Sequence, residues 1–187
     1  MIREFGTALR MMFLMTLLLG GLYPVLMTGA AEAMFPAAAS GSLIERDGRV
    51  VGSELIAQKF TQEGFFWPRP SAVDFNPLPS GGSNLSPVAK QLRERWSERR
   101  ALFAGRDDVP QELLFASASG LDPHLSPAGA LFQVPRVARA RGVAEERLKQ
   151  LVRDHTEGPQ WGFLGESRVN VLKLNLALLD LLSERNP

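Results

Sequence analysis

The feature that most constrains this chain is an uncharged apolar run near its N-terminus. From Met11 to Ala31 the sequence reads MMFLMTLLLGGLYPVLMTGAA, without one charged side chain. At about 1.5 Å of rise per residue, a helix of this length crosses a hydrocarbon core about 30 Å thick. We therefore predict one transmembrane helix over residues 11–31.

Charges on either side of the run indicate its orientation. Arg3 and Arg10 precede it, and the first charge after it is Glu32. Positive side chains gather on the cytoplasmic side of membrane helices, so residues 1–10 are predicted to be cytoplasmic and the rest of the chain to lie outside. A cleaved signal peptide is the alternative, because small residues follow the run as they do at cleavage sites. Both interpretations deliver the rest of the chain to the same side.

The charge balance and the residue types exclude several classes of function. The 21 Lys and Arg residues are offset by 20 Asp and Glu, so a nucleic-acid partner bound through a basic face has no support. Cysteine is absent, which excludes disulfides and thiolate metal sites. The two histidines, His124 and His155, do not have the spacing of an HExxH motif, so we expect no metal site.

Behind the apolar run, the sequence predicts a mixture of helices and strands without an internal repeat. Residues 32–49, rich in Ala, Ser and Gly, are predicted to be a connector that ends in a turn at residues 46–49. Residues 50–187 are predicted to form a single small extracytoplasmic α+β domain. Segment 64–87 has five prolines and three glycines, and its aromatic residues favour an ordered, irregular loop. The remaining expected elements are helices over 54–60, from Ser86 to Phe103, from Ser126, from Val134, over 144–155 and over 176–185, and strands over 113–119 and 169–175.

One polar segment resembles a hydrolase triad only superficially. Ser117, Ser119, Asp122 and His124 lie within eight residues of one another. Triads are assembled from separated segments, however, and no GxSxG elbow surrounds either serine. Turn formation explains the sequence SGLDPH better, so we predict no catalytic residues here and reject a secreted hydrolase.

A second segment, LPSGGSNLSP at residues 78–87, contains two adjacent glycines whose backbone N–H groups are able to converge on an anion. The chain lacks GxxxxGK[ST], and no lysine lies between Lys59 and Lys90 to meet a phosphate. It also lacks DKTG, the tetrapeptide around the aspartate that P-type pumps phosphorylate. We therefore predict that this chain alone neither hydrolyses ATP nor, with one apolar helix, conducts ions.

Three stretches, residues 52–87, 115–142 and 169–180, carry the motifs RPSAV, SGGSN, SASGLDP and QVPRVARARG. Together they resemble the C subunit of the Kdp potassium-transporting ATPase. The resemblance implies an accessory subunit of a high-affinity potassium pump in the bacterial inner membrane. The implied partners are a channel-like potassium-binding subunit, a P-type ATPase subunit, a small single-span subunit and membrane lipid. ATP and potassium are then handled by the complex, and this chain is expected to bind no cofactor alone.

The resemblance leaves two roles open. In the first, the chain is a non-catalytic subunit that stabilises the complex and helps ions to enter the pump. Its partner interface is then expected at Gly20, Gly21, Phe65, Phe66, Trp67 and Arg69, although packing within the domain is the alternative for the aromatic residues. In the second, the chain is a catalytic chaperone that raises the ATP affinity of the ATPase subunit through Ser80, Gly81, Gly82 and Asn84. The predicted topology opposes the second role, because ATP is cytoplasmic and this loop is predicted to lie outside.

Overall fold

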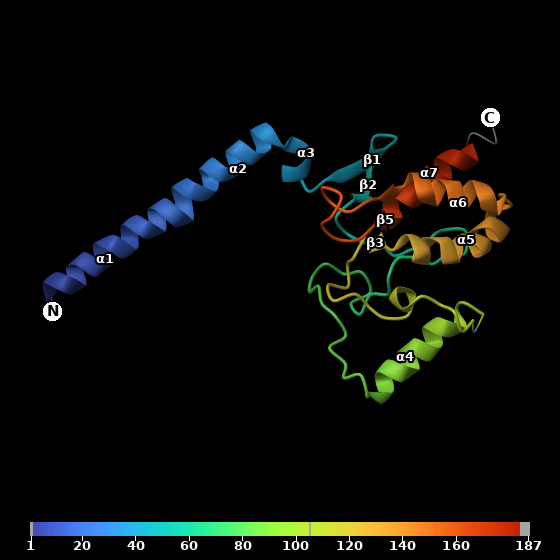
Figure 1. The fold of residues 1–187 in the computed structure, drawn as a ribbon. Coiled ribbons are helices and arrows are strands. Elements are labelled where there is room, and N and C mark those ends of the chain that lie inside the picture. The colour runs from blue at the N-terminus through green and yellow to red at the C-terminus, as the bar shows by residue number, and fades with distance from the viewer. Residues whose placement is uncertain (1, 105, 184–187) are drawn as a thin grey trace. The chain divides into compact units, whose positions relative to one another are not determined.

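The computed structural model describes residues 2–104 and 106–183, and they form two compact units that divide between Val51 and Gly52 (Figure 1). The first unit contains a long N-terminal helix followed by a β-hairpin. The second contains a small sheet, four α-helices and long irregular segments. The α+β fold class predicted from the sequence is confirmed.

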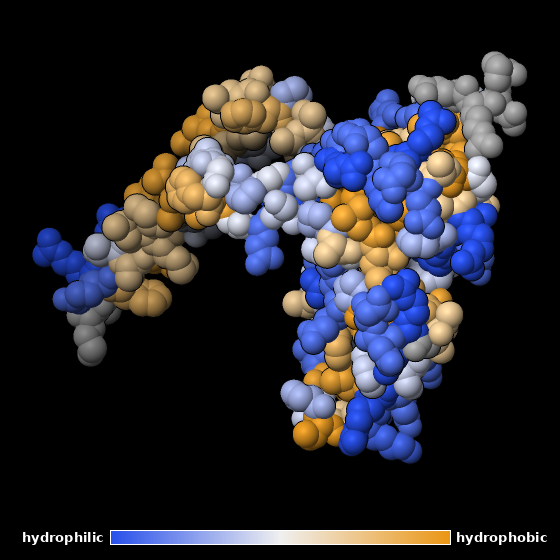
Figure 2. All heavy atoms as spheres, turned by 45° about the vertical axis from the view of Figure 1, so that its right-hand side comes forward, coloured by the Kyte–Doolittle hydropathy of each residue, from blue (hydrophilic) through white to orange (hydrophobic). Residues whose placement is uncertain are grey.

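The N-terminal helix consists of α1 (Ile2–Leu17), the π-helical turn η1 (Leu18–Leu22) and α2 (Tyr23–Met34). The wide turn has a local cause, since Pro24 has no N–H and its ring collides with the preceding turn of a regular helix. In η1 the Tyr23 N–H donates to the Leu18 carbonyl, five residues back, which makes room for the ring. Residues 3–34 are long and apolar enough to cross a membrane, and Figure 2 shows their apolar side chains exposed along the helix. The predicted helix is confirmed and extends beyond residues 11–31 at both ends.

The segment predicted as a connector contains regular structure. A short helix, α3 (Pro36–Ala39), precedes two paired strands, β1 (Leu43–Arg46) and β2 (Arg49–Ser53). Asp47 and Gly48 join the strands with φ angles of 52° and 72°, which is the left-handed pair that a two-residue hairpin turn requires. The turn at residues 46–49 is confirmed, but β-branched side chains on both sides of it make strands rather than an unstructured link.

Three helices pack around a short antiparallel sheet in the second unit (Figure 1). The sheet order is β3-β5-β4, with bounds β3 (His124–Leu125), β4 (Thr156–Glu157) and β5 (Arg168–Asn170). The helices are α5 (Pro127–Arg141), α6 (Glu145–Asp154) and α7 (Val171–Ser183). Their apolar faces make the core, in which the fully buried side chains include Leu125, Val134, Val137, Leu148, Val152, Val169, Leu174 and Leu178.

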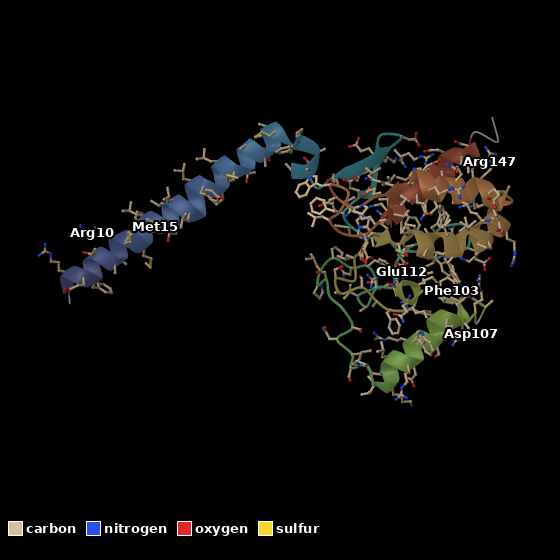
Figure 3. The ribbon with its side chains drawn as sticks, in the orientation of Figure 1. Arg10, Met15, Phe103, Asp107, Glu112 and Arg147 are labelled. Atoms are coloured by element: carbon tan, nitrogen blue, oxygen red, sulfur yellow. The ribbon has the colours of Figure 1, made fainter. Side chains whose placement is uncertain are left out.

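Helix α5 shows which sequence signals held and which did not. Ser126 caps it as predicted, because its hydroxyl accepts from the Gly129 N–H at 3.0 Å and its own N–H donates to Glu112 at 2.9 Å. Figure 3 labels Glu112, which approaches this cap from a neighbouring segment. A separate helix starting at Val134 was wrong, since Pro135 lies inside α5. The complete burial of Val134 and its neighbours offsets the roughly 3 kcal/mol that an internal proline costs.

Two other predicted elements differ because distant groups take over the backbone hydrogen bonds. Residues 54–60 are irregular rather than helical, since the Ala57 N–H donates to the Leu121 carbonyl at 2.9 Å. Residues 113–119 do not form a strand: a 3₁₀ turn, η2 (Gln111–Leu113), leads into a loop in which the Ser117 N–H donates to Pro70. Tertiary contacts thus override local preference in both segments.

The remaining predicted helices are confirmed with shifted boundaries, whereas the predicted strand over 169–175 is confirmed only at its first two residues and is wrong for residues 171–175, which are helical. The strand expected over 169–175 ends at Asn170, whose side chain accepts from the Lys173 N–H at 3.1 Å and so starts α7 early. Helix α4 (Lys90–Ala101) lies within the predicted helix from Ser86 to Phe103, and α6 agrees with residues 144–155. The expected C-terminal helix is α7, and its predicted residues 184–185 lie outside the described residues. Segment 64–87 is irregular, as expected.

Candidate functional site

The aromatic segment, residues 63–69, is held in place through its backbone rather than through a sheet. The Asn175 side chain on α7 accepts from the Phe66 N–H at 2.8 Å and donates to the Phe66 carbonyl at 2.9 Å. The Gln133 side chain on α5 likewise accepts from the Trp67 N–H at 2.8 Å and donates to the Trp67 carbonyl at 3.0 Å. Both carboxamides are almost completely buried, at 1 % exposure. Each carboxamide thus satisfies both main-chain groups of one residue, as a neighbouring strand does, and we call this pair the carboxamide latch.

Two arginines of α5 complete the attachment. The Arg136 guanidinium donates to the carbonyls of Glu63 and Phe65 and lies 3.7 Å from the centroid of the Trp67 ring. Arg141 donates to the Gly64 carbonyl at 2.8 Å and stacks over Phe65. Burial lowers the pKa of Arg136 to about 10, an effect that the nearby Glu63 carboxylate opposes. The cations therefore order the loop through planar stacking and carbonyl contacts.

The predicted interface residues of this segment have different environments. Phe66 is completely buried in the core, so the interpretation of Phe66 as an exposed partner anchor is corrected: it packs within the domain. Phe65, Trp67 and Arg69 remain partly exposed. Arg69 forms an ion pair with Asp122 at 3.0 Å. A hollow of about 260 Å³ opens beside Trp67 and Arg69.

The glycine loop, residues 78–84, packs against the segment that resembles a triad. The Gly81 N–H donates to the Ser119 carbonyl at 2.8 Å. A Cβ on Gly82 would lie 3.1 Å from the Ala118 carbonyl oxygen, so the two backbones approach closely. Ser80 and Asn84, the other predicted ATP contacts, are exposed. The loop therefore uses one glycine as a hydrogen-bond donor to its own chain and the other as a close packing surface.

The hydroxyl and carboxylate groups of SASGLDPH form turns, as the sequence predicts. The Ser119 hydroxyl accepts from the Leu121 N–H at 3.1 Å, and Asp122 accepts from the His124 N–H at 3.0 Å. Burial, and secondarily the charge of Arg168, lower the pKa of His124. Within the described residues, no group of three His, Asp or Glu side chains is arranged to hold a metal ion.

Gly20 and Gly21 lie in the π-helical turn of the membrane helix, and an added Cβ on Gly21 would meet nothing within 4 Å. The pair thus leaves a shallow notch on the helix, of the kind that permits a neighbouring helix to approach.

Sequence reasoning missed the residues that hold the aromatic segment. Gln133 and Arg136 belong to the motif QVPRVARARG, and Asn175 ends VNVLKLN. A signal was available, because a polar carboxamide on an otherwise apolar helix face requires a buried partner. What the sequence could not supply was the identity of that partner, which lies 109 residues away for Asn175.

Comparison with known proteins agrees with the motifs. Residues 5–180 match the family described as KdpC, the c chain of the K+-transporting ATPase. The potassium-transporting ATPase KdpC subunit of Polaromonas naphthalenivorans (strain CJ2) is 52 % identical over 179 residues, covering 91 % of each chain. That of Geobacter sulfurreducens is 51 % identical over 183 residues, covering 94 % of this chain and 97 % of the relative. With a match of this extent, the chain belongs to the KdpC family, and it is a single-span C subunit of the potassium-transporting ATPase complex.

Proposed function

We propose that this chain is a non-catalytic accessory subunit that stabilises the potassium pump and helps ions to enter it. Its partners are a channel-like potassium-binding subunit, a P-type ATPase subunit and a small single-span subunit. The N-terminus is cytoplasmic and the domain lies outside the bacterial inner membrane, with Arg3 and Arg10 as the orienting charges. The chain binds no cofactor alone, and ATP and potassium are handled by its partners.

The observation that carries this proposal is the bond between the Gly81 N–H and the Ser119 carbonyl. A phosphate cradle needs several N–H groups that are free to point at the anion. Here the first glycine donates to the chain itself, and the second lies against the Ala118 backbone. The glycine loop is a structural turn that joins two long irregular segments, rather than a nucleotide site.

The docking surface of the domain is formed by the exposed edges of Phe65, Trp67 and Arg69. Aromatic and Arg side chains dominate the energetics of many protein interfaces. The carboxamide latch and the stacked arginines fix this segment before any partner binds, which reduces the entropy lost on association. The hollow of about 260 Å³ beside Trp67 is a place for a partner side chain.

The orientation is tested by cysteine labelling, for which the chain has no native cysteine to remove. Ser83→Cys places a thiol in the glycine loop, and Thr7→Cys provides the matched position at the N-terminal end of the long helix, before its uncharged run over residues 11–31. Intact cells are treated with a membrane-impermeant maleimide. Labelling at 83 and protection at 7 support the proposal. Labelling at 83 only after lysis, with or without the partner subunits, would overturn it and restore the nucleotide role.

The interface is tested in the assembled pump. Trp67→Ala with Arg69→Ala should reduce recovery of the partner subunits during purification, while Arg147→Ala, an exposed change on α6, should not. The double variant must first show the circular dichroism of the folded chain. Full recovery of the pump with normal potassium-stimulated ATP hydrolysis would remove this segment from the interface.

A further inference from the structure

Between β4 and β5 the chain forms a second, tight hairpin at residues 158–165. The Gln160 N–H donates to the Leu164 carbonyl at 2.8 Å, and the Leu164 N–H returns a bond of 2.9 Å. Trp161 and Gly162 turn the chain with φ angles of 53° and 83°. A left-handed conformation is unfavourable for a bulky residue such as Trp, so the closed hairpin holds Trp161 at the tip against its local preference.

This hairpin tip exposes more apolar surface than a turn requires. Trp161 is 83 % exposed, Phe163 75 % and Leu164 46 %. No residue from 158 to 165 is charged, although Glu157 and Glu166 lie directly on either side. Large exposed apolar side chains that lie this close together in the sequence are typical of a surface that is covered in use.

The base of the hairpin lies beside the point where the chain enters the domain. Lys173 Nζ is 2.5 Å from one Glu54 carboxylate oxygen and 3.7 Å from one of Glu157, the last residue before the tip. The Asn170 side chain also donates to the Glu54 carbonyl at 2.7 Å. Only residues 35–51 separate Gly52 from the end of the membrane helix. This end of the domain is therefore covalently tethered to the bilayer.

We propose that the hairpin tip inserts into the headgroup layer of the same bilayer that holds the N-terminal helix. Trp side chains prefer this layer, where the ring contacts acyl chains while the indole N–H stays hydrated. Phe163 and Leu164 gain from leaving water, and the absence of charge from residues 158–165 removes the main penalty for insertion. The same lack of charge leaves little to specify a protein partner. The inference holds for either orientation of the helix and does not rest on the proposed role in the pump.

The test uses nitroxide labels on single cysteines in the full chain, reconstituted in phosphatidylcholine vesicles. Labels at Trp161→Cys and Phe163→Cys report the tip, and Arg147→Cys on the exposed face of α6 is the matched control (Figure 3). Power saturation compares collisions with oxygen, which concentrates in lipid, with collisions with a nickel chelate, which stays in water. The ratio of oxygen to nickel collisions is expected to be several-fold higher at 161 and 163 than at 147.

Each alternative result overturns the inference. A ratio at 161 and 163 equal to that at 147 means that the tip lies in water. A tip that is water-exposed in vesicles but shielded from both agents in the complete pump is covered by a protein partner instead. In the chain labelled at 163, the further change Trp161→Glu is expected to withdraw the label from lipid. The check on folding is a second chain that carries Trp161→Glu and a label at 147, whose spectrum should be unchanged. A label that stays in lipid would show that Trp161 does not anchor the tip.

Discussion

Replacing Asn175 by Leu should destabilise the domain far more than the loss of one polar side chain from its surface would. Leu branches at the same atom as Asn and is not smaller, so the change removes the carboxamide without opening a cavity. It leaves the N–H and the carbonyl of Phe66 without their partner, in a residue that is completely buried. Each unsatisfied buried group costs about 1–3 kcal/mol, so the free energy of unfolding should fall by about 2–5 kcal/mol.

The assay is thermal unfolding of the purified full chain in detergent, followed by near-ultraviolet circular dichroism of the aromatic residues. For a domain of this size, about 3–5 °C are lost per kcal/mol, so the melting temperature should fall by roughly 6–25 °C. The matched control is Gln150→Leu, which removes an exposed carboxamide bonded to Asp154 on α6 and should change stability by no more than about 0.5 kcal/mol.

The same reasoning predicts coupling between the two halves of the carboxamide latch. Gln133→Leu alone should cost about as much as Asn175→Leu, but the double variant should cost less than their sum by about 1 kcal/mol or more. The reason is that the first change already loosens the segment that the second carboxamide holds. The reasoning is refuted if Asn175→Leu has the same melting temperature as the Gln150→Leu control. It is also refuted if the stability losses of Gln133→Leu and Asn175→Leu are strictly additive in the double variant.

Four further variants test other parts of the domain. Gly81→Ala should be tolerated within about 0.5 kcal/mol, whereas Gly82→Val should cost about 1–3 kcal/mol in chemical denaturation, because only the second added side chain meets backbone. Burial lowers the pKa of His124, so the unfolded chain binds the proton more readily, and wild-type stability should fall as pH drops from 6.5 through the lowered pKa. The urea midpoint of His124→Gln should vary less with pH over that range than the wild-type midpoint does. An equal pH dependence of the two midpoints would contradict this. Ser126→Ala removes the cap bond to Gly129 and should cost about 1–2 kcal/mol by thermal unfolding, with an unchanged melting temperature as the contrary result.

The elements that the sequence predicted well are those with local causes. The membrane helix follows from an uncharged run, and α5 begins where Ser126 caps it and Pro127 fits the first turn. Helix α6 follows from apolar spacing alone. In each case the information that specifies the element lies within the element, so one sequence is enough to find it.

The elements that were missed depend on groups distant in the sequence. Residues 54–60 have a helical pattern, but their backbone is bonded to the segment around Leu121. Strands β3 and β4 have only two residues each, too few for an alternating pattern to be detected. The candidate site was located through its aromatic residues, whereas the polar residues that position it, Gln133 and Asn175, could be found only from contacts across the fold.

The carboxamide latch has a consequence for how the sequence of the aromatic segment is able to evolve. Asn175 and Gln133 bind peptide groups, which every residue except proline supplies in full. These bonds therefore do not depend on which side chain positions 66 and 67 carry, whereas the Trp67 ring holds the loop separately, through its packing against the core and under Arg136. A related pump is therefore able to change the exposed side chains of this segment while the backbone bonds of the carboxamide latch stay the same.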